Sequence, residues 1–211
     1  MRNRTSQILF DYWNTVRDGR TAPQRIEIDP SALSQILSQT IILEVSDANN
    51  FPFRIAGTAV CEFLGAEMRG RNFMELWTPS DRRKLQASFD SSLAAGMPVT
   101  AGISSRAFGD GVQISEILLL PLHDHHGQLT RLLGSWSQEN PPSQIGIPGR
   151  LVKQHSLSSI SGSWPSGTTE PPPIFEAPAI EPPPTLFSNL GMRIVRRERR
   201  QFGIVDGGRT D

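Results

Sequence analysis

A strand–glycine–helix junction is the first place in this sequence where chemistry could occur. The pair Gly57-Thr58 separates the apolar run FRIA (53–56) from a helix-like segment, and such junctions can hold a phosphate. A phosphate-binding loop needs several glycines and a Lys-Ser/Thr pair, whereas here one glycine precedes an apolar segment without lysine. The junction therefore predicts a sharp turn with close packing, for which glycine is suited.

The single cysteine is the next candidate. Cys61 lies beside Val60, Phe63 and Leu64, with no His or Lys nearby in the sequence to stabilise a thiolate. A flavin-adduct or redox role is the alternative, but a small buried hydrophobe is the favoured interpretation.

The stretch HDHHG (123–127) combines imidazoles with a carboxylate, which are metal-ligand types. Adjacent residues around a turn point in different directions, and His155 stands alone in the sequence. A solvated turn is therefore favoured over a metal or haem site. Because no nucleophile–base or paired-carboxylate spacing can be read either, we expect no enzyme activity.

Composition limits the class of protein. The chain has 211 residues, 21 basic and 21 acidic, 37% hydrophobic residues and one cysteine. The charge balance provides no global attraction to nucleic acid or membrane, and a lone cysteine suits a reducing compartment. No signal-peptide core precedes residue 13 and no apolar run reaches the roughly 18 residues of a membrane span, so we expect a cytoplasmic protein.

Two segments mark a change in organisation near residue 160. Residues 171–185, PPPIFEAPAIEPPPT, contain seven prolines and predict an extended linker. The run RIVRRERR at 193–200 carries five arginines: Arg193, Arg196, Arg197, Arg199 and Arg200. It is either a solubilising segment or a contact for nucleic acid or an anionic membrane. We therefore predict a folded domain over 1–160 and a flexible tail over 161–211.

Periodicity predicts the elements of the domain. Helices are expected over 7–17, from Asp29-Pro30 through Leu37, over 58–65 with Thr58 as the cap and Gly65 at the end, and from Thr78 to Gly96. Strands are expected over 40–45, 51–57, 99–108, 112–122 and 130–136. This order predicts an α/β fold of α+β type, with one five-stranded antiparallel sheet and helices on one face.

The fourth expected strand is apolar on both faces. Leu118 and Leu120 alternate with Ile117 and Leu119, whereas an antiparallel strand with one wet face would alternate with polar residues. The outer face must therefore be covered, either by helix 7–17 or by a second copy of the chain.

The stretch at 53–85, FRIAGTAVCEFLGAEMRGRNFMELWTPSDRRKL, resembles the PAS domain family. Seven residues lie where the PAS pattern places them: Gly65, Glu67, Gly70, Phe73, Leu76, Pro79 and Asp81. More narrowly, the chain resembles a bacterial family of stand-alone PAS proteins, formerly a family of unknown function. The matching segments are YWNTVRDGRTAPQRIEIDP (12–30), GTAVCEFLG, LWTPSDR, EILLLPL, LLGSW and the terminal VDGGR.

The resemblance implies a PAS fold with an N-terminal covering helix, signalling work and no catalysis. The cofactor stays unknown. Ten residues are expected between helices and sheet: Phe53, Ile55, Val60, Phe63, Leu64, Phe73, Leu76, Trp77, Leu118 and Trp136. They line either a small-molecule pocket or, as the default interpretation, a packed core. A second set is expected at an interface: Ile8, Leu9, Tyr12, Trp13, Val16, Ile117 and Leu119.

Three functions remain open. The favoured one is a non-catalytic signalling adaptor that binds a protein partner or forms a homodimer, with or without gating by a ligand in the pocket. The second is a sensor for haem, flavin or a nucleotide second messenger. The third is a binder of nucleic acid or membrane through 193–200.

Overall fold

Three α-helices and six strands make up the part of the chain described by the computed structural model, which comprises residues 1–47, 49–106, 112–139, 154–162 and 164. The helices are α1 (Arg4–Arg17), α2 (Thr58–Leu64) and α3 (Pro79–Ala95), with 3-10 turns η1 (Arg25–Glu27), η2 (Pro30–Leu33), η3 (Leu37–Gln39) and η4 (Phe73–Leu76). The strands are β1 (Thr40–Glu44), β2 (Phe53–Ala56), β3 (Val99–Arg106), β4 (Val112–His123), β5 (Leu129–Gln138) and β6 (Gln154–Gly162).

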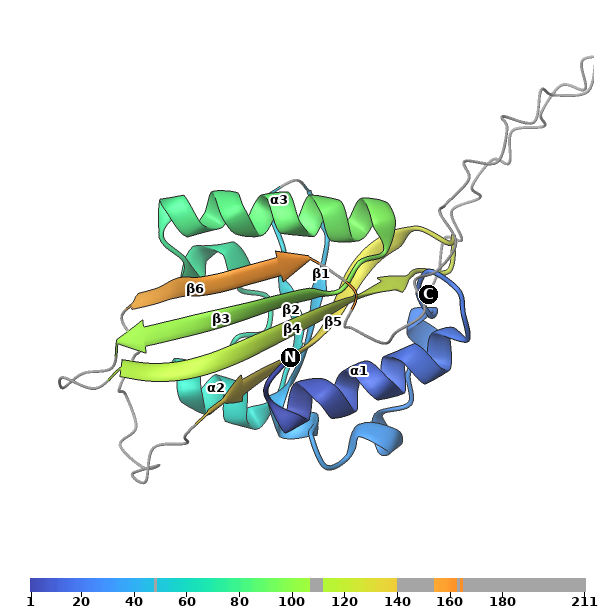
Figure 1. Cartoon of the computed structure of the whole chain (residues 1–211), viewed down its shortest axis with the longest axis horizontal. Coiled ribbons are helices and arrows are strands. Elements are labelled where there is room, and N and C mark those ends of the chain that lie inside the picture. The colour runs from blue at the N-terminus through green and yellow to red at the C-terminus, as the bar shows by residue number, and fades with distance from the viewer. Residues whose placement is uncertain (48, 107–111, 140–153, 163, 165–211) are drawn as a thin grey trace, which may run out of the picture. The chain divides into compact units, whose positions relative to one another are not determined.

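The strands form one antiparallel sheet in the order β2-β1-β5-β4-β3-β6 (Figure 1). The predicted α+β fold with an antiparallel sheet is confirmed, and the five expected strands are β1 to β5. The sheet nevertheless has six strands, because β6 adds to the edge of β3. Its sequence, QHSLSSISG, is rich in serine, and Ile160 is its only β-branched residue, so its composition does not indicate a strand.

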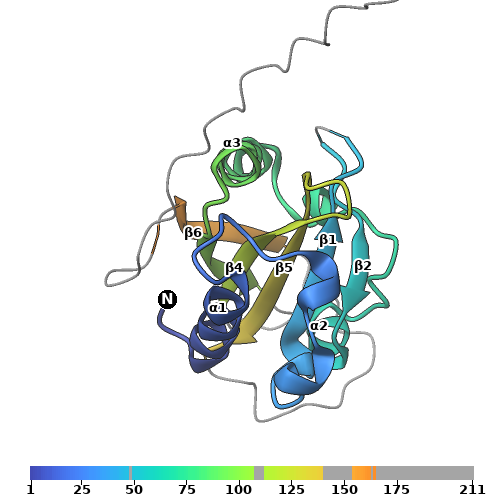
Figure 2. The ribbon, with the colours of Figure 1, turned by 90° about the vertical axis from the view of Figure 1, so that its right-hand side faces the viewer.

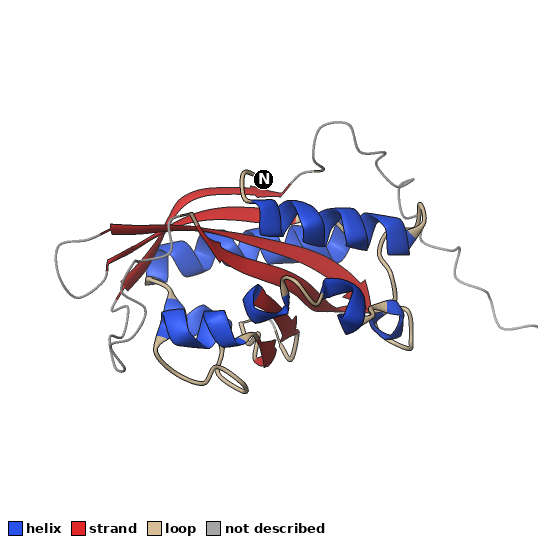
Figure 3. Cartoon of the chain, turned by 90° about the horizontal axis from the view of Figure 1, so that it is seen from below, coloured by secondary structure: helices blue, strands red, loops and turns tan. Residues whose placement is uncertain are grey.

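Helices cover both faces of the sheet, with α3 and α1 on opposite sides (Figures 2 and 3). One core, which we call the inner core, lies between the sheet and α2, η4 and α3. The other, which we call the α1 core, lies between the sheet and α1. The indole Nε1 of Trp13 in α1 donates to the carbonyl of Pro121 at 2.9 Å. Helix α1 is therefore the predicted cover of the outer face.

Capping residues fix the ends of the helices. Thr78 Oγ1 accepts from the N–H of Asp81 at 3.3 Å and starts α3. Gly65 and Gly96 end α2 and α3 in the left-handed region, at φ 71° and 68°, as expected of glycine. Thr58 is the first residue of α2 and does not cap it, which corrects that prediction.

The segment after α1 folds differently from the expected helix. Asp29 Oδ1 accepts from the N–H of Ser31 at 2.9 Å, which confirms the predicted start. The turn is a 3-10 helix, however, and Ile36, at φ −121°, separates it from η3.

The predicted boundary at residue 160 lies inside β6. The proline-rich stretch 171–185 and the arginines of 193–200 lie outside the described residues, so the flexible tail and its anionic partners stay predictions.

Candidate functional site

Eight of the ten predicted pocket residues lie in one core cluster, between the sheet and α2, η4 and α3. They are Phe53, Val60, Phe63, Leu64, Phe73, Leu76, Trp77 and Trp136. The sequence therefore identified most of this cluster.

The other two predicted residues lie elsewhere. Ile55 is 45% exposed, because the β1–β2 pairing shifts at Ile42/Leu43 and leaves Arg54 as an extra residue. A bulge of this kind reverses the alternation of side chains. Leu118 lies in the core under α1, so its assignment to the pocket was wrong.

Five rings at the centre of the inner core form what we call the aromatic cluster: Phe63, Phe73, Trp77, Trp136 and His155. The indoles of Trp77 and Trp136 stack with centroids 6.0 Å apart and planes 15° from parallel. The imidazole of His155 lies 5.4 Å from Trp136, 5.8 Å from Trp77 and 5.9 Å from Phe63, centroid to centroid. Elements α2, η4, β5 and β6 thus meet at one point.

Polar atoms lie among these rings. Trp136 Nε1 donates to Ser115 Oγ at 3.2 Å, and His155 Nδ1 lies 2.8 Å from Ser105 Oγ. Trp77 is 3% exposed, and its Nε1 is buried without a hydrogen-bond partner. Since buried donors are nearly always paired in proteins, this indole N–H is an unusual feature of the core.

His155 is the member of the cluster that the sequence did not reveal. Burial lowers the pKa of its imidazole to about 4, so the ring is neutral near pH 7. It appeared isolated because β6 begins 16 positions after the end of β5 at Gln138. The residues of β6 that contact the core, His155, Leu157 and Ile160, show only a broken alternation, which the register shift at Gly102/Ile103 explains.

The predicted interface residues are divided between the two faces of the sheet. Leu9 and Trp13 are 0% exposed and pack under α1 against the chain's own sheet. Ile117 and Leu119 belong to the inner core, so the two faces of β4 had been assigned the wrong way round. The remaining members, Ile8, Tyr12 and Val16, are half-buried on α1.

Cys61 is half-buried on α2. Its Sγ donates weakly to Ala56 O at 3.9 Å and Glu67 Oε1 at 3.8 Å. Burial raises the pKa of the thiol, as does the neighbouring carboxylate, so the group is a thiol at neutral pH.

The histidine-rich segment forms a turn organised by its carboxylate. Asp124 accepts from the backbone N–H groups of His126 and Gln128 at 2.8 and 3.0 Å, and from Thr130 Oγ1 at 3.2 Å. These bonds, Gln128 first, lower the pKa of Asp124. In the described part of the chain, no group of three His, Cys, Asp or Glu side chains is placed to hold a metal ion.

The chain corresponds to a known protein family. Residues 1–137 match the PAS domain model, and the chain belongs to the PAS domain family. PAS domains are signalling sensor domains, and the match ends inside β5, before β6. No curated protein was found to match the chain. None of the described helices is long and apolar enough to cross a membrane.

Solved structures resemble the chain weakly. The dark structure of the blue-light photoreceptor Aureochrome1 LOV has 17% identity and a TM-score of 0.41, covering 53% of this chain and 82% of that one. An RNA-binding Light-Oxygen-Voltage receptor has 21% identity and a TM-score of 0.41, covering 52% and 33%. The Rhodobacter sphaeroides LOV protein has 14% identity and a TM-score of 0.40, covering 55% and 71%. These similarities assign neither a ligand nor a partner.

Proposed function

We propose that this chain is a non-catalytic PAS signalling protein that acts by contact with another protein, and that a small molecule at the aromatic cluster gates this contact. The observation that supports gating by a ligand is that Trp77 Nε1 is a buried donor without a hydrogen-bond partner. A donor left unpaired in the core costs free energy, which an acceptor atom on a ligand would recover.

The chemistry of the cluster favours a planar molecule that carries a hydrogen-bond acceptor. The nearly parallel indoles of Trp77 and Trp136 present aromatic faces, and aromatic rings pack well against other flat rings. The neutral imidazole of His155 adds a polar neighbour beside them. Haem, flavin and nucleotide second messengers all contain a planar group of this kind.

We assign the partner contact to helix α1. Ile8, Tyr12 and Val16 keep part of their side chains exposed there, and half-exposed apolar side chains on a helix suit a protein partner or a second copy of the chain. A second candidate function uses the same cluster: a sensor whose chief activity is ligand binding, with no dedicated partner.

Native mass spectrometry of the full-length protein, isolated gently from its own host, tests the proposal. We expect added small-molecule mass on the wild-type chain, less of it on Trp77→Phe, and no change on the matched control Trp164→Phe. Trp77→Phe keeps a six-membered aromatic ring and removes the N–H together with the five-membered ring of the indole. Trp164→Phe makes the same change in the α1 core, outside the cluster.

The spectrum separates the candidates. Bound mass together with a dimer or a second protein supports the gated adaptor, while bound mass on a monomer supports the sensor. Wild-type and Trp77→Phe proteins that carry the same added mass would show that the cluster is not the site. A bare monomer would contradict both functions.

A further inference from the structure

Strand β6 is an edge strand that lies outside the matched part of the family. It pairs with β3 from Val99↔Gly162 to Arg106↔Gln154, and it is the last strand on that side of the sheet (Figure 1). The family match ends at residue 137. The strands of the matched region are therefore complete without β6, and β6 is an addition to the β3 edge.

The composition of β6 provides little apolar contact. Four of its nine residues are serine and one is glycine. Of its described side chains only His155 is buried, while Leu157 and Ile160 are half-buried. The β3–β6 register also shifts at Gly102/Ile103. Elements with few buried apolar contacts open at lower free energy than the core strands.

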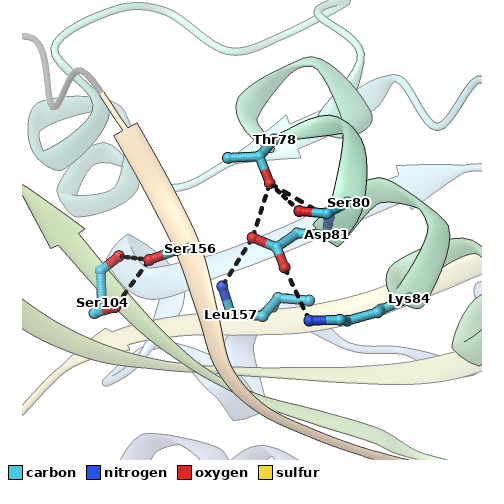
Figure 4. A network of polar contacts seen from close by, with 7 residues as sticks. All are labelled: Thr78, Ser80, Asp81, Lys84, Ser104, Ser156 and Leu157. Carbon is cyan, nitrogen blue, oxygen red and sulfur yellow. Dashed lines mark hydrogen bonds and ion pairs between the residues drawn. The ribbon is translucent and has the colours of Figure 1, made fainter.

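A small polar network holds β6 to α3 and β3 (Figure 4). Asp81 Oδ2 accepts from the N–H of Leu157 at 3.4 Å, and Lys84 Nζ lies 3.4 Å from Asp81 Oδ1. On the opposite side of β6, the hydroxyls of Ser104 and Ser156 lie 3.0 Å apart. Asp81 is 6% exposed. Its carboxylate therefore binds the edge of β6 that faces away from β3 and joins it to α3.

The strand also carries one wall of the aromatic cluster. His155 is 3% exposed, and its ring contacts those of Phe63, Trp77 and Trp136. The other four rings come from α2, from β5 and from η4 and the residue that follows it. Removal of β6 would take the imidazole away from the indole rings of Trp77 and Trp136.

We propose that β6 is a displaceable closing strand: its release from the β3 edge and from Asp81 withdraws His155 and opens the aromatic cluster. What enters the opening rests on the proposed function, but the release of the strand does not. The release would give a molecule in solution access to Trp77 and Trp136, which are 3% exposed while the strand is in place.

Hydrogen–deuterium exchange tests the release of β6, in a variant in which a reversible disulfide joins β6 to β3. Ser104 and Ser156 face each other across β3 and β6, so two cysteines there are placed to form a disulfide. We make S104C/S156C in a Cys61→Ser background, because Cys61 is the only native cysteine. We expect reduced protein to exchange its β6 amides at least about tenfold faster than its β4 amides, and oxidation to remove this difference.

Two further variants test the hydrogen bond between Leu157 and Asp81. Asp81→Ala is expected to speed β6 exchange beyond its effect on β4, because the acceptor for Leu157 is lost. Lys84→Ala is the matched control, since it removes the ion pair and leaves the Asp81–Leu157 contact. Exchange of β6 at the rate of β4 in wild-type protein, or no slowing on oxidation, would overturn the proposal.

The fluorescent dye 8-anilinonaphthalene-1-sulfonate reports whether the release uncovers the cluster. We expect the reduced S104C/S156C protein to bind the dye and the oxidised protein to lose this binding. Equal binding in both states would overturn the role of β6 in closing the cluster. Native mass spectra without a bound small molecule would refute only the proposed ligand, because exchange and dye binding are measured without it.

Discussion

Stability should fall at acid pH because of His155. Burial lowers the pKa of the folded imidazole to about 4 from 6.5. Below pH 6.5 the unfolded chain therefore binds a proton at this residue that the folded chain binds only near pH 4. The unfolded state binds more protons in this window, so the contribution of His155 to the free energy of unfolding rises with pH between about 4 and 6.5 and is constant above it.

The magnitude follows from the two pKa values. The full difference corresponds to about 3 kcal/mol, of which about 2 kcal/mol is lost between pH 8 and pH 5. His155 is 3% exposed, so solvent screens the effect little. Groups outside the aromatic cluster are the same in wild-type protein and in variants at position 155, so their effects cancel in the comparison.

Urea unfolding followed by circular dichroism at several values between pH 5 and pH 8 measures this effect. His155→Phe keeps an aromatic ring and removes the titration. It also leaves Ser105 Oγ without its partner, at a cost of about 1–3 kcal/mol that does not change with pH. We expect the wild-type protein to lose about 2 kcal/mol more than this variant from pH 8 to pH 5.

His125→Phe is the matched control, because His125 is exposed in the turn, and it should keep the wild-type pH dependence. The reasoning is refuted if wild-type and His155→Phe proteins lose the same free energy of unfolding between these pH values. Such a result would mean that the folded chain protonates His155 as easily as the unfolded chain does.

Two other predictions concern packing. Gly57→Ala places a Cβ against the backbone oxygens of the residues at 37 and 38 and should cost about 3 kcal/mol or more in urea unfolding. Gly70→Ala, with open space but φ 81°, should cost only about 1–2 kcal/mol, and equal losses would contradict the clash. Trp164→Ala removes a ring 4.5 Å from the Arg17 guanidinium and should lower the free energy of unfolding by about 1 kcal/mol. Trp164→Phe should retain most of this stability, and an unchanged Trp164→Ala protein would show that the contact is not stabilising.

The sequence by itself determined the PAS fold and most of the inner core. Caps and stops such as Thr78, Gly65 and Gly96 act within one helical turn, so their effect can be read from neighbouring residues. The two apolar faces of β4 likewise required a cover, which α1 supplies. These predictions succeeded because each depends on local periodicity or local hydrogen bonding.

Tertiary structure alone decided which apolar face of β4 lies in the inner core, that Ile55 is exposed, and that His155 joins the aromatic cluster. The bulge that exposes Ile55 arises from the pairing of two strands, and the register of β4 is fixed by both of its neighbours. His155 gains its role only because β6 adds to the edge formed by β3, whose paired residues lie 48 (Arg106↔Gln154) to 63 (Val99↔Gly162) positions earlier in the chain. Long-range pairing of this kind depends on which surfaces meet after folding, and no periodicity in the strand's own residues records it.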